Sequence, residues 1–269
     1  MLKQYNGWFG EFSLNPEIDF YGDNYWTRIA SKTYEPDTMV FLENHLDSGT
    51  DFIDVGAATG GISIIAASLG ARVLSFEAVP RVYEIACEHL KNNPDFSHAI
   101  DLQNSAISSQ TGILQLGENA DPRILASISN DPLANATEVK IVSLIEQIEL
   151  FHASNRRLVV KIDIEGAEWK LLSDKATLNG LRQHSALVLL AIHPGFSRPY
   201  KVLPLGLTYF SKKYWQLQNF FVGYLFFKRL LQVATIKRTS TDRIKSAKKC
   251  ILLMFGGYFE FILDFNEIR

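Results

Sequence analysis

Two acids and two glycines mark the stretch with the clearest chemical potential. DFIDVGAATGGISIIAASLGARVLSFEAVP spans residues 51–80: Asp54 ends one predicted strand, Gly56 and Gly60 follow in a turn, and Glu77 ends the next strand. A carboxylate at a strand end binds an ammonium group or ribose hydroxyls, and glycine lets a ligand approach the backbone closely. The stretch therefore predicts a nucleoside-type ligand.

The turn lacks what two common ligands require. A triphosphate loop needs Lys and Ser or Thr directly after its last glycine, but Ile62 and Ser63 follow Gly56 and Gly61. A dinucleotide loop needs a second glycine to admit the pyrophosphate, and Ala58 stands there. S-adenosylmethionine (SAM) carries no phosphate and can spare that glycine. Its ammonium group suits the Asp54 carboxylate, and its ribose hydroxyls suit Glu77.

A second group of acids lies in KIDIEGAE, where a later strand is expected to end. Lys161, Asp163 and Glu165 alternate and share one face while the chain stays extended. Lys161 lies within an apolar strand, so we expect an ion pair with a neighbouring carboxylate. Asp163, Glu165 and His193, the last at the tip of the next strand, are the candidate catalytic residues. A divalent metal held by their oxygens is an alternative, but no spacing demands one, and we predict no metal site.

The sequence resembles the FkbM-type methyltransferases. YEPDTMVFLENHL, FIDVGAATGG, SFEAVP, NSAIS and VVKIDIEGAEWKLL occur in the order seen in that family, over roughly residues 34–193. The resemblance implies methyl transfer from SAM to a hydroxyl oxygen, often on sugars or natural products. The cofactor-binding residues that it implies are Glu35, Asp54, Gly56, Ala57, Gly60, Glu77, Ala78, Ser105, Ala106 and Asp163.

The sequence departs from the family pattern at three places. Ala58 replaces the usual Asn after DVGA, and Ala78 replaces the usual Pro after the ribose-binding Glu. An acid common near the end of the fifth strand is absent from LLAIHPGF, where Ala191 and His193 stand. The third departure puts the identity of a catalytic base in doubt.

Alternating strand and helix patterns from residue 50 onward position these residues. They predict an α/β fold with a mostly parallel sheet covered by helices on both faces. The resemblance implies a Rossmann-like class I methyltransferase fold whose seven-stranded sheet has a reversed final strand. Apolar runs on both sides of Gly256-Gly257 predict an antiparallel hairpin at the C-terminal end of this sequence. A second hairpin is expected around Thr111-Gly112.

We expect residues 1–48 to form an aromatic-rich extension and 49–269 to form the methyltransferase domain, with an inserted cap or lid at about 196–248. The segment 209–231 could be a lid, a homodimer surface, a peripheral membrane contact or a helix packed in the core.

Composition narrows the function classes. The 269 residues are 47% hydrophobic and 21% charged, with a net charge of −2 and two cysteines. Such a chain builds a large core, and its charge favours a small-molecule or glycan acceptor over nucleic acid. Without a recognisable signal peptide, we expect a cytoplasmic protein. The alternatives to an O-methyltransferase are a non-catalytic binding module of the same fold and, disfavoured by Ala58, an NAD-dependent oxidoreductase.

Overall fold

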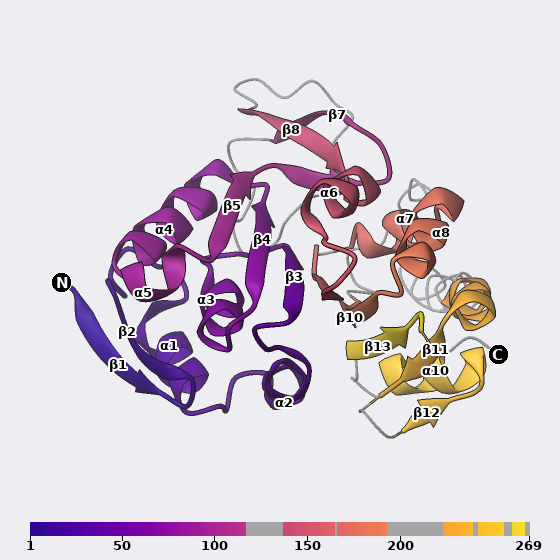
Figure 1. Cartoon of the computed structure of the whole chain (residues 1–269), viewed down its shortest axis with the longest axis horizontal. Helices are drawn as coiled ribbons and strands as arrows, with labels where there is room; N and C mark the ends of the chain where they lie inside the picture. The colour runs from indigo at the N-terminus through magenta and orange to yellow at the C-terminus, as the bar shows by residue number, and fades with distance from the viewer. Residues whose placement is uncertain (117–136, 165, 193–222, 239–241, 256–259, 267–269) are drawn as a thin grey trace, which may run out of the picture.

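Strands of two to six residues, most of them apolar, build the central sheet of this computed structural model (Figure 1). The structure describes residues 1–116, 137–164, 166–192, 223–238, 242–255 and 260–266. Within these ranges the sheet has eight strands in the order β12-β11-β13-β10-β9-β3-β4-β5. Their bounds are β3 Thr50–Val55, β4 Arg72–Glu77, β5 Ile100–Asn104, β9 Arg157–Ile162, β10 Leu187–Ala191, β11 Thr235–Lys237, β12 Arg243–Ile244 and β13 Glu260–Asp264.

Parallel pairing runs from β5 to β10, and β13 is antiparallel to both of its neighbours, β10 and β11. Leaving out the edge strand β12, this is a seven-stranded sheet with one reversed strand. The predicted Rossmann-like class I methyltransferase fold is therefore confirmed, with one strand more than expected. Every residue of β3 is buried, as expected for a strand covered on both faces.

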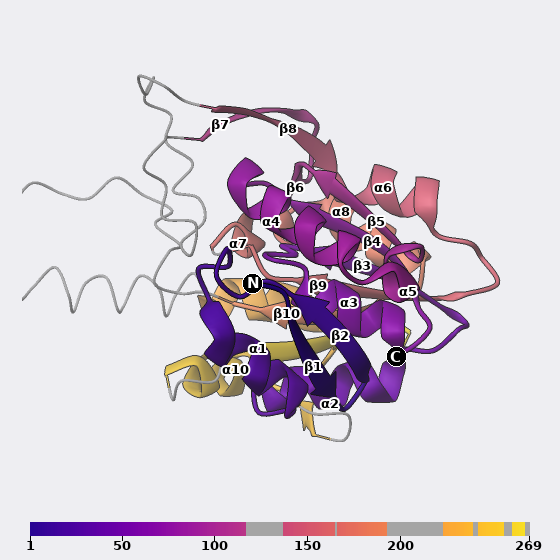
Figure 2. The ribbon, with the colours of Figure 1, turned by 90° about the vertical axis from the view of Figure 1, so that its left-hand side faces the viewer.

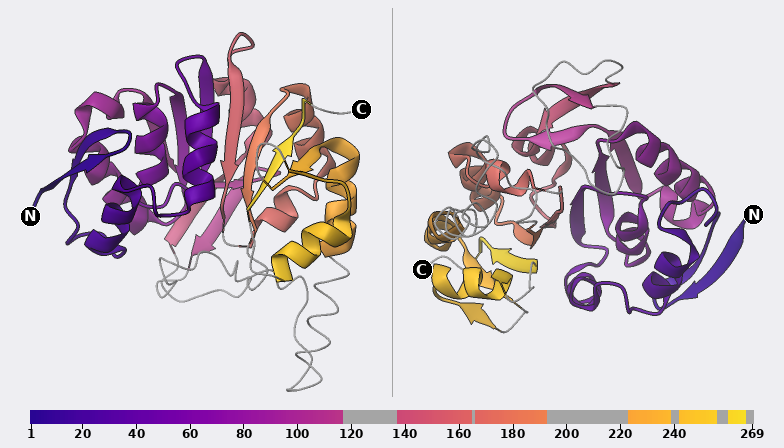
Figure 3. Two further views of the ribbon diagram at one scale, coloured as in Figure 1. Left: turned by 90° about the horizontal axis from the view of Figure 1, so that it is seen from below. Right: turned by 180° about the vertical axis from the view of Figure 1, so that it is seen from behind.

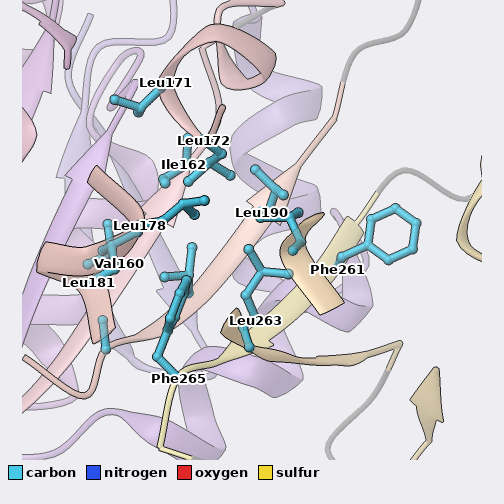
Figure 4. Packing of buried hydrophobic residues seen from close by; sticks show 14 of the residues in the cluster. Val160, Ile162, Leu171, Leu172, Leu178, Leu181, Leu190, Phe261, Leu263 and Phe265 are labelled. Atoms are coloured by element: carbon cyan, nitrogen blue, oxygen red, sulfur yellow. The ribbon is translucent and has the colours of Figure 1, made fainter. Parts of the chain in front are cut away.

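Helices cover both faces of the sheet (Figure 3). Their bounds are α1 Gly22–Ala30, α2 Pro36–His45, α3 Gly61–Ser68, α4 Pro80–Lys91, α5 Pro94–Ser97, α6 Leu144–Phe151, α7 Glu168–Leu171, α8 Lys175–Gln183, residues 223–233 and α10 Ala247–Phe255. One core contains Phe52 and Val159 of the sheet with residues of α1, α2 and α3. The other joins Val160 and Leu190 to α6, α7, α8, residues 223–233 and α10 (Figure 4).

The segment 1–48 packs against the sheet rather than apart from it. It forms the hairpin of β1 Lys3–Gly7 and β2 Gly10–Leu14, followed by α1 and α2. Trp26 of α1 is buried beside Phe12, and its indole nitrogen donates to Asp19 at 2.8 Å. These aromatic residues therefore belong to the core that also holds Phe52 of β3.

Two hairpin predictions are wrong in detail. The run before Gly256-Gly257 is helix α10 and not a strand; Ala247, Cys250 and Ile251 are buried at the spacing of one helix face. Only the second arm, β13, is extended; residues 256–259 lie outside the described ranges.

The chain around Thr111-Gly112 does not form the expected hairpin either. Strand β8 (Thr137–Ser143) lies between β6 (Ala106–Ser108) and β7 (Gly112–Leu116). Ile141 is opposite both Ala106 and Gly112, so β8 pairs with both flanking strands. This small sheet lies at the opposite end of the molecule from α2 (Figures 1 and 2).

The predicted cap overlaps the central sheet. Strands β11 and β12 fall inside the segment 196–248 but pair within that sheet. In the helix 223–233, Phe226, Phe227 and Leu230 are buried in the core, whereas Tyr224 and Leu225 are exposed. Residues 193–222, which hold the rest of the predicted cap, lie outside the described ranges.

Candidate functional site

A buried polar row crosses three parallel strands near their carboxyl ends. The register places Ser75 of β4, Asp54 of β3 and Lys161 of β9 side by side. Ser63 of α3 completes the row: its hydroxyl donates to Asp54 Oδ2 at 2.7 Å and lies 2.8 Å from the Ser75 hydroxyl. Each of these side chains is almost fully buried, so the row is fixed before any ligand binds.

Lys161 makes the ion pair expected of a lysine in an apolar strand. Its Nζ lies 2.9 Å from Asp163 Oδ2 and 4.0 Å from Asp54 Oδ1. Burial lowers the pKa of Lys161, but the carboxylates of Asp163, Asp54 and Glu35 together raise it above its ordinary value. Lys161 is therefore a fixed positive charge that orients Asp163.

Asp54 keeps an unused hydrogen-bonding atom. Burial raises its pKa to about 6 against the opposing effects of Lys161 and Ser63. Its Oδ1 is buried and has no hydrogen-bond partner. A buried acceptor without a donor is costly, and an ammonium group from a ligand would supply that donor. The residues present thus fit the amino end of SAM.

Glu77 ends β4 beside the same turn. Its carboxylate accepts the N–H groups of Ala58 at 3.0 Å and Val79 at 2.8 Å. Burial raises the pKa of Glu77 to about 7, although these backbone donors lower it. A carboxylate has about four acceptor positions, so Glu77 keeps acceptor capacity for ribose hydroxyls beside its backbone donors.

Protein packing alone is enough to require a glycine at position 56. Its φ is +90°, and a Cβ added there would lie 1.9 Å from the carbonyl oxygen of Asp163. The backbones of the loops after β3 and β9 are therefore in close contact at Gly56. Gly60 has a φ of +88° but meets only the Ala86 side chain, at 3.5 Å. That Gly56 also lets a ligand approach the backbone closely stays a prediction.

The other residues implied by the resemblance lie along this edge. Ser105 and Ala106 follow β5, whose last residue Asn104 is paired with Glu77. The Asn104 side chain donates to the carbonyl oxygens of Glu77 and Ala78. Ala57, in the turn, is buried.

Glu35 stands at the start of α2 in a strained left-handed conformation, with φ of 40°. Burial raises the pKa of the neighbouring Tyr34, and Glu35 and Asp163 raise it further. The negative charge of Glu35 also raises the pKa of Lys161 and the pKa of Glu260, the first residue of β13. The start of α2 therefore reaches the end of β9.

Two candidate catalytic residues, Glu165 and His193, lie outside the described ranges. Sequence analysis missed Tyr34 and Glu260 as members of this edge. Tyr34 directly precedes Glu35 in the YEPDTMVFLENHL motif, which was a usable signal. Glu260 had no such signal, because its place depends on which strands pair with β13.

A surface hollow lies at the opposite edge of the sheet, where the parallel strands begin. This cavity of ≈ 670 Å³ is bordered by the starts of β9 and β10. Its cations already have partners: Arg156 contacts Asp51 at 2.5 Å, and Lys237 contacts Asp264 at 2.8 Å. We therefore consider this hollow a weaker candidate ligand site than the carboxyl ends of the strands.

Among the described residues, no group of three or more His, Cys, Asp or Glu side chains is placed to hold a metal ion. In the same part of the chain, no helix is both long and apolar enough to cross a membrane.

Comparison with known proteins names no family for the chain. No family model matches it, and no curated protein matches it. Solved structures that resemble it include a putative rRNA-methylase from Clostridium thermocellum, with 11% identity, 85% of this chain and 92% of that chain covered, and a TM-score of 0.39. An O-methyltransferase from Bacillus cereus in complex with SAH has 10% identity, 89% and 85% coverage, and a TM-score of 0.42. A fibrillarin/Nop5p complex has 10% identity, 86% and 80% coverage, and a TM-score of 0.44.

Proposed function

We propose that this protein is a SAM-dependent O-methyltransferase that acts on a hydroxyl group of a saccharide, glycolipid or natural product. The observation that carries the proposal is the pair of buried carboxylates, Asp54 and Glu77, at the ends of adjacent parallel strands. Asp54 offers an unpaired acceptor for an ammonium group, and Glu77 retains acceptor capacity for ribose. The FkbM-type motifs in the sequence support the hydroxyl acceptor.

The protein's own residues have distinct tasks in this proposal. SAM supplies a methyl group on a positively charged sulfur. Asp54 and Glu77 bind its two polar ends. The Lys161 Nζ lies 2.9 Å from Asp163 Oδ2 and holds that carboxylate near them. Tyr34, half-buried next to Glu35, helps to exclude water from this edge. Alignment and water exclusion supply much of the catalysis in a direct displacement.

The cofactor is tested by calorimetry with SAM, S-adenosylhomocysteine and NAD. We expect the first two to bind and NAD not to bind. Glu77→Ala should weaken SAM binding by about 1–3 kcal/mol, because two hydroxyls lose their acceptor. Glu84→Ala, which changes an exposed acid on α4, is the matched control and should leave affinity unchanged. NAD binding, or equal affinity in both variants, would contradict the proposal.

Methyl transfer itself is tested with SAM tritiated on its methyl group. Free sugars, glycolipids and polyketide alcohols are offered in turn, and labelled product and S-adenosylhomocysteine are both measured. A second candidate function, a binding module without chemistry, is favoured by Ala191, which leaves the tip of β10 without an acid. That module would bind SAM tightly yet accumulate no S-adenosylhomocysteine with any acceptor.

A further inference from the structure

The acid missing from the tip of β10 has a counterpart on the neighbouring strand. Because β13 runs antiparallel to β10, its first residue, Glu260, lies opposite Ala191 at the carboxyl edge. On the other side of β10, Leu190 is paired with Ile162, the residue before Asp163. Asp163, Ala191 and Glu260 therefore form one row across three strands.

This row lies on the sheet face that carries the proposed cofactor residues. Alternation puts Glu260 on the face of Ile262, and Ala191 on the face of Leu189; both apolar residues pack in the core of α2. Two strand spacings separate the backbones of Asp163 and Glu260, which is roughly 10 Å. Ala191 stands between them in the register, and its side chain is only a methyl group.

The surroundings of Glu260 make it a weak acid. Burial and the Glu35 carboxylate raise its pKa to about 7, against a hydrogen bond with Thr38. It also borders a small pocket between α2 and β13. The charged and titratable groups around it are Glu35, Asp37, His45, Lys161 and Arg238.

We propose that Glu260 is the residue that takes the proton of the acceptor hydroxyl, an inference that rests on the proposed methyl transfer. The hydroxyl oxygen forms the new O–C bond with a lone pair, and the C–S bond of the sulfonium breaks with its electron pair left on sulfur. The hydroxyl proton passes to the Glu260 carboxylate and from there to solvent. The products are a methyl ether, neutral S-adenosylhomocysteine and one released proton.

The other described acids of this edge suit this task less well. Asp163 is paired with Lys161 at 2.9 Å, which stabilises its charged form and weakens it as a base. Asp54 is assigned to the ammonium group of SAM in the proposed function, through its buried Oδ1. Glu77 belongs to β4, beyond β3 and β9 from Ala191. A base is most effective when its pKa lies near the working pH, as it does for Glu260.

The test compares Glu260→Gln with Asp37→Asn, which removes an exposed carboxylate bordering the same pocket. Single-turnover release of S-adenosylhomocysteine is followed with the acceptor found in the screen, or with water as the acceptor if none is found. Glu260→Gln should be slower by about 10²–10⁴-fold and lose the rise in rate near pH 7. Asp37→Asn should keep the rate at high pH, while its pH profile moves slightly toward lower pH, because the Asp37 carboxylate also raises the pKa of Glu260. SAM affinity should stay within about twofold in each variant.

A measurement without turnover accompanies it. Carbon-13 NMR of labelled glutamate carboxyl groups, with the signal assigned by its loss in Glu260→Gln, should show a titration near pH 7. A titration near the ordinary value of 4.5, or Glu260→Gln with the wild-type rate and pH profile, would overturn the assignment while leaving methyl transfer in place. Failure of the wild type to bind SAM would overturn both the assignment and the proposed function.

Discussion

At the residue scale, the position of Gly56 beside the chain after β9 has room for a hydrogen atom but not for a side chain. Gly56→Ala would place a methyl carbon 1.9 Å from the Asp163 carbonyl oxygen, at a backbone angle that alanine rarely adopts. We expect the variant to lose about 3 kcal/mol or more of unfolding free energy, from overpacking and strain together. Chemical denaturation measures this loss. Gly60→Ala, which has strain without a clash, should lose only about 1 kcal/mol; equal losses would contradict the packing role.

Glu77 should couple cofactor binding to proton release. Burial raises its pKa to about 7 in the free protein, so part of the population is protonated near neutral pH. Ribose hydroxyls donate to the charged form and lower that pKa on binding. SAM affinity should therefore rise with pH between about 5.5 and 7.5 and then level off. Calorimetry in buffers of different ionisation heat counts the released protons; uptake of protons would reverse the assignment.

At the scale of an element, β3 has one buried acid near each end, and the two acids have different roles. Asp51 is fully buried and accepts from Arg72 at 2.9 Å, Arg156 at 2.5 Å and the Ala153 N–H at 2.9 Å. Although burial raises its pKa, these partners together lower it below the ordinary value. Asp51 has no orphaned oxygen, in contrast to Asp54, and we assign it to stability.

Asp51→Asn should cost about 1–3 kcal/mol, because it removes the buried charge that accepts from Arg72 and Arg156, whose guanidinium groups are themselves partly exposed. A lowered folded-state pKa gives stability that is present above the unfolded value of 3.8 and is lost as the pH falls through the folded value. The variant should therefore show a smaller loss of melting temperature between pH 5 and pH 2 than the wild type. Asp47→Asn, in an exposed pair with Arg157, is the control and should change stability far less.

The elements near the turn could be predicted because their signals are local. The strands that contain Asp54 and Glu77 and the helix after Gly60 all lie within about thirty residues, in which the hydrophobic period changes between that of a strand and that of a helix. Long-range pairing was harder. Nothing near Thr111 indicates that β8 enters between β6 and β7, and nothing near Gly256 places Glu260 beside Ala191. Helix α10 was missed because a short apolar run fits either period.

At the scale of the whole molecule, the β1–β2 hairpin and helix α1 supply part of the core on one face of the sheet. Phe12, Leu14, Trp26 and Ile29 are each at most 2% exposed and pack with residues of β3 and α3. Their burial contributes roughly 6–12 kcal/mol, which is comparable to the whole stability of a domain. Deleting residues 1–33 should therefore abolish cooperative thermal unfolding, as scanning calorimetry would show. Deleting only the exposed Met1 and Leu2 should not change the transition.

The reversed strand β13 also sets an order of assembly during synthesis. Strands β3, β4 and β5 follow one another along the chain and can pair early, which completes the Asp54–Glu77 end of the sheet. Strand β11 meets β10 only through β13, whose last residue, Asp264, is made after everything else in the sheet. A ribosome-bound chain that stops at residue 255 would thus expose the edge of β10. The half proposed to bind the cofactor should form before the half proposed to bind the acceptor.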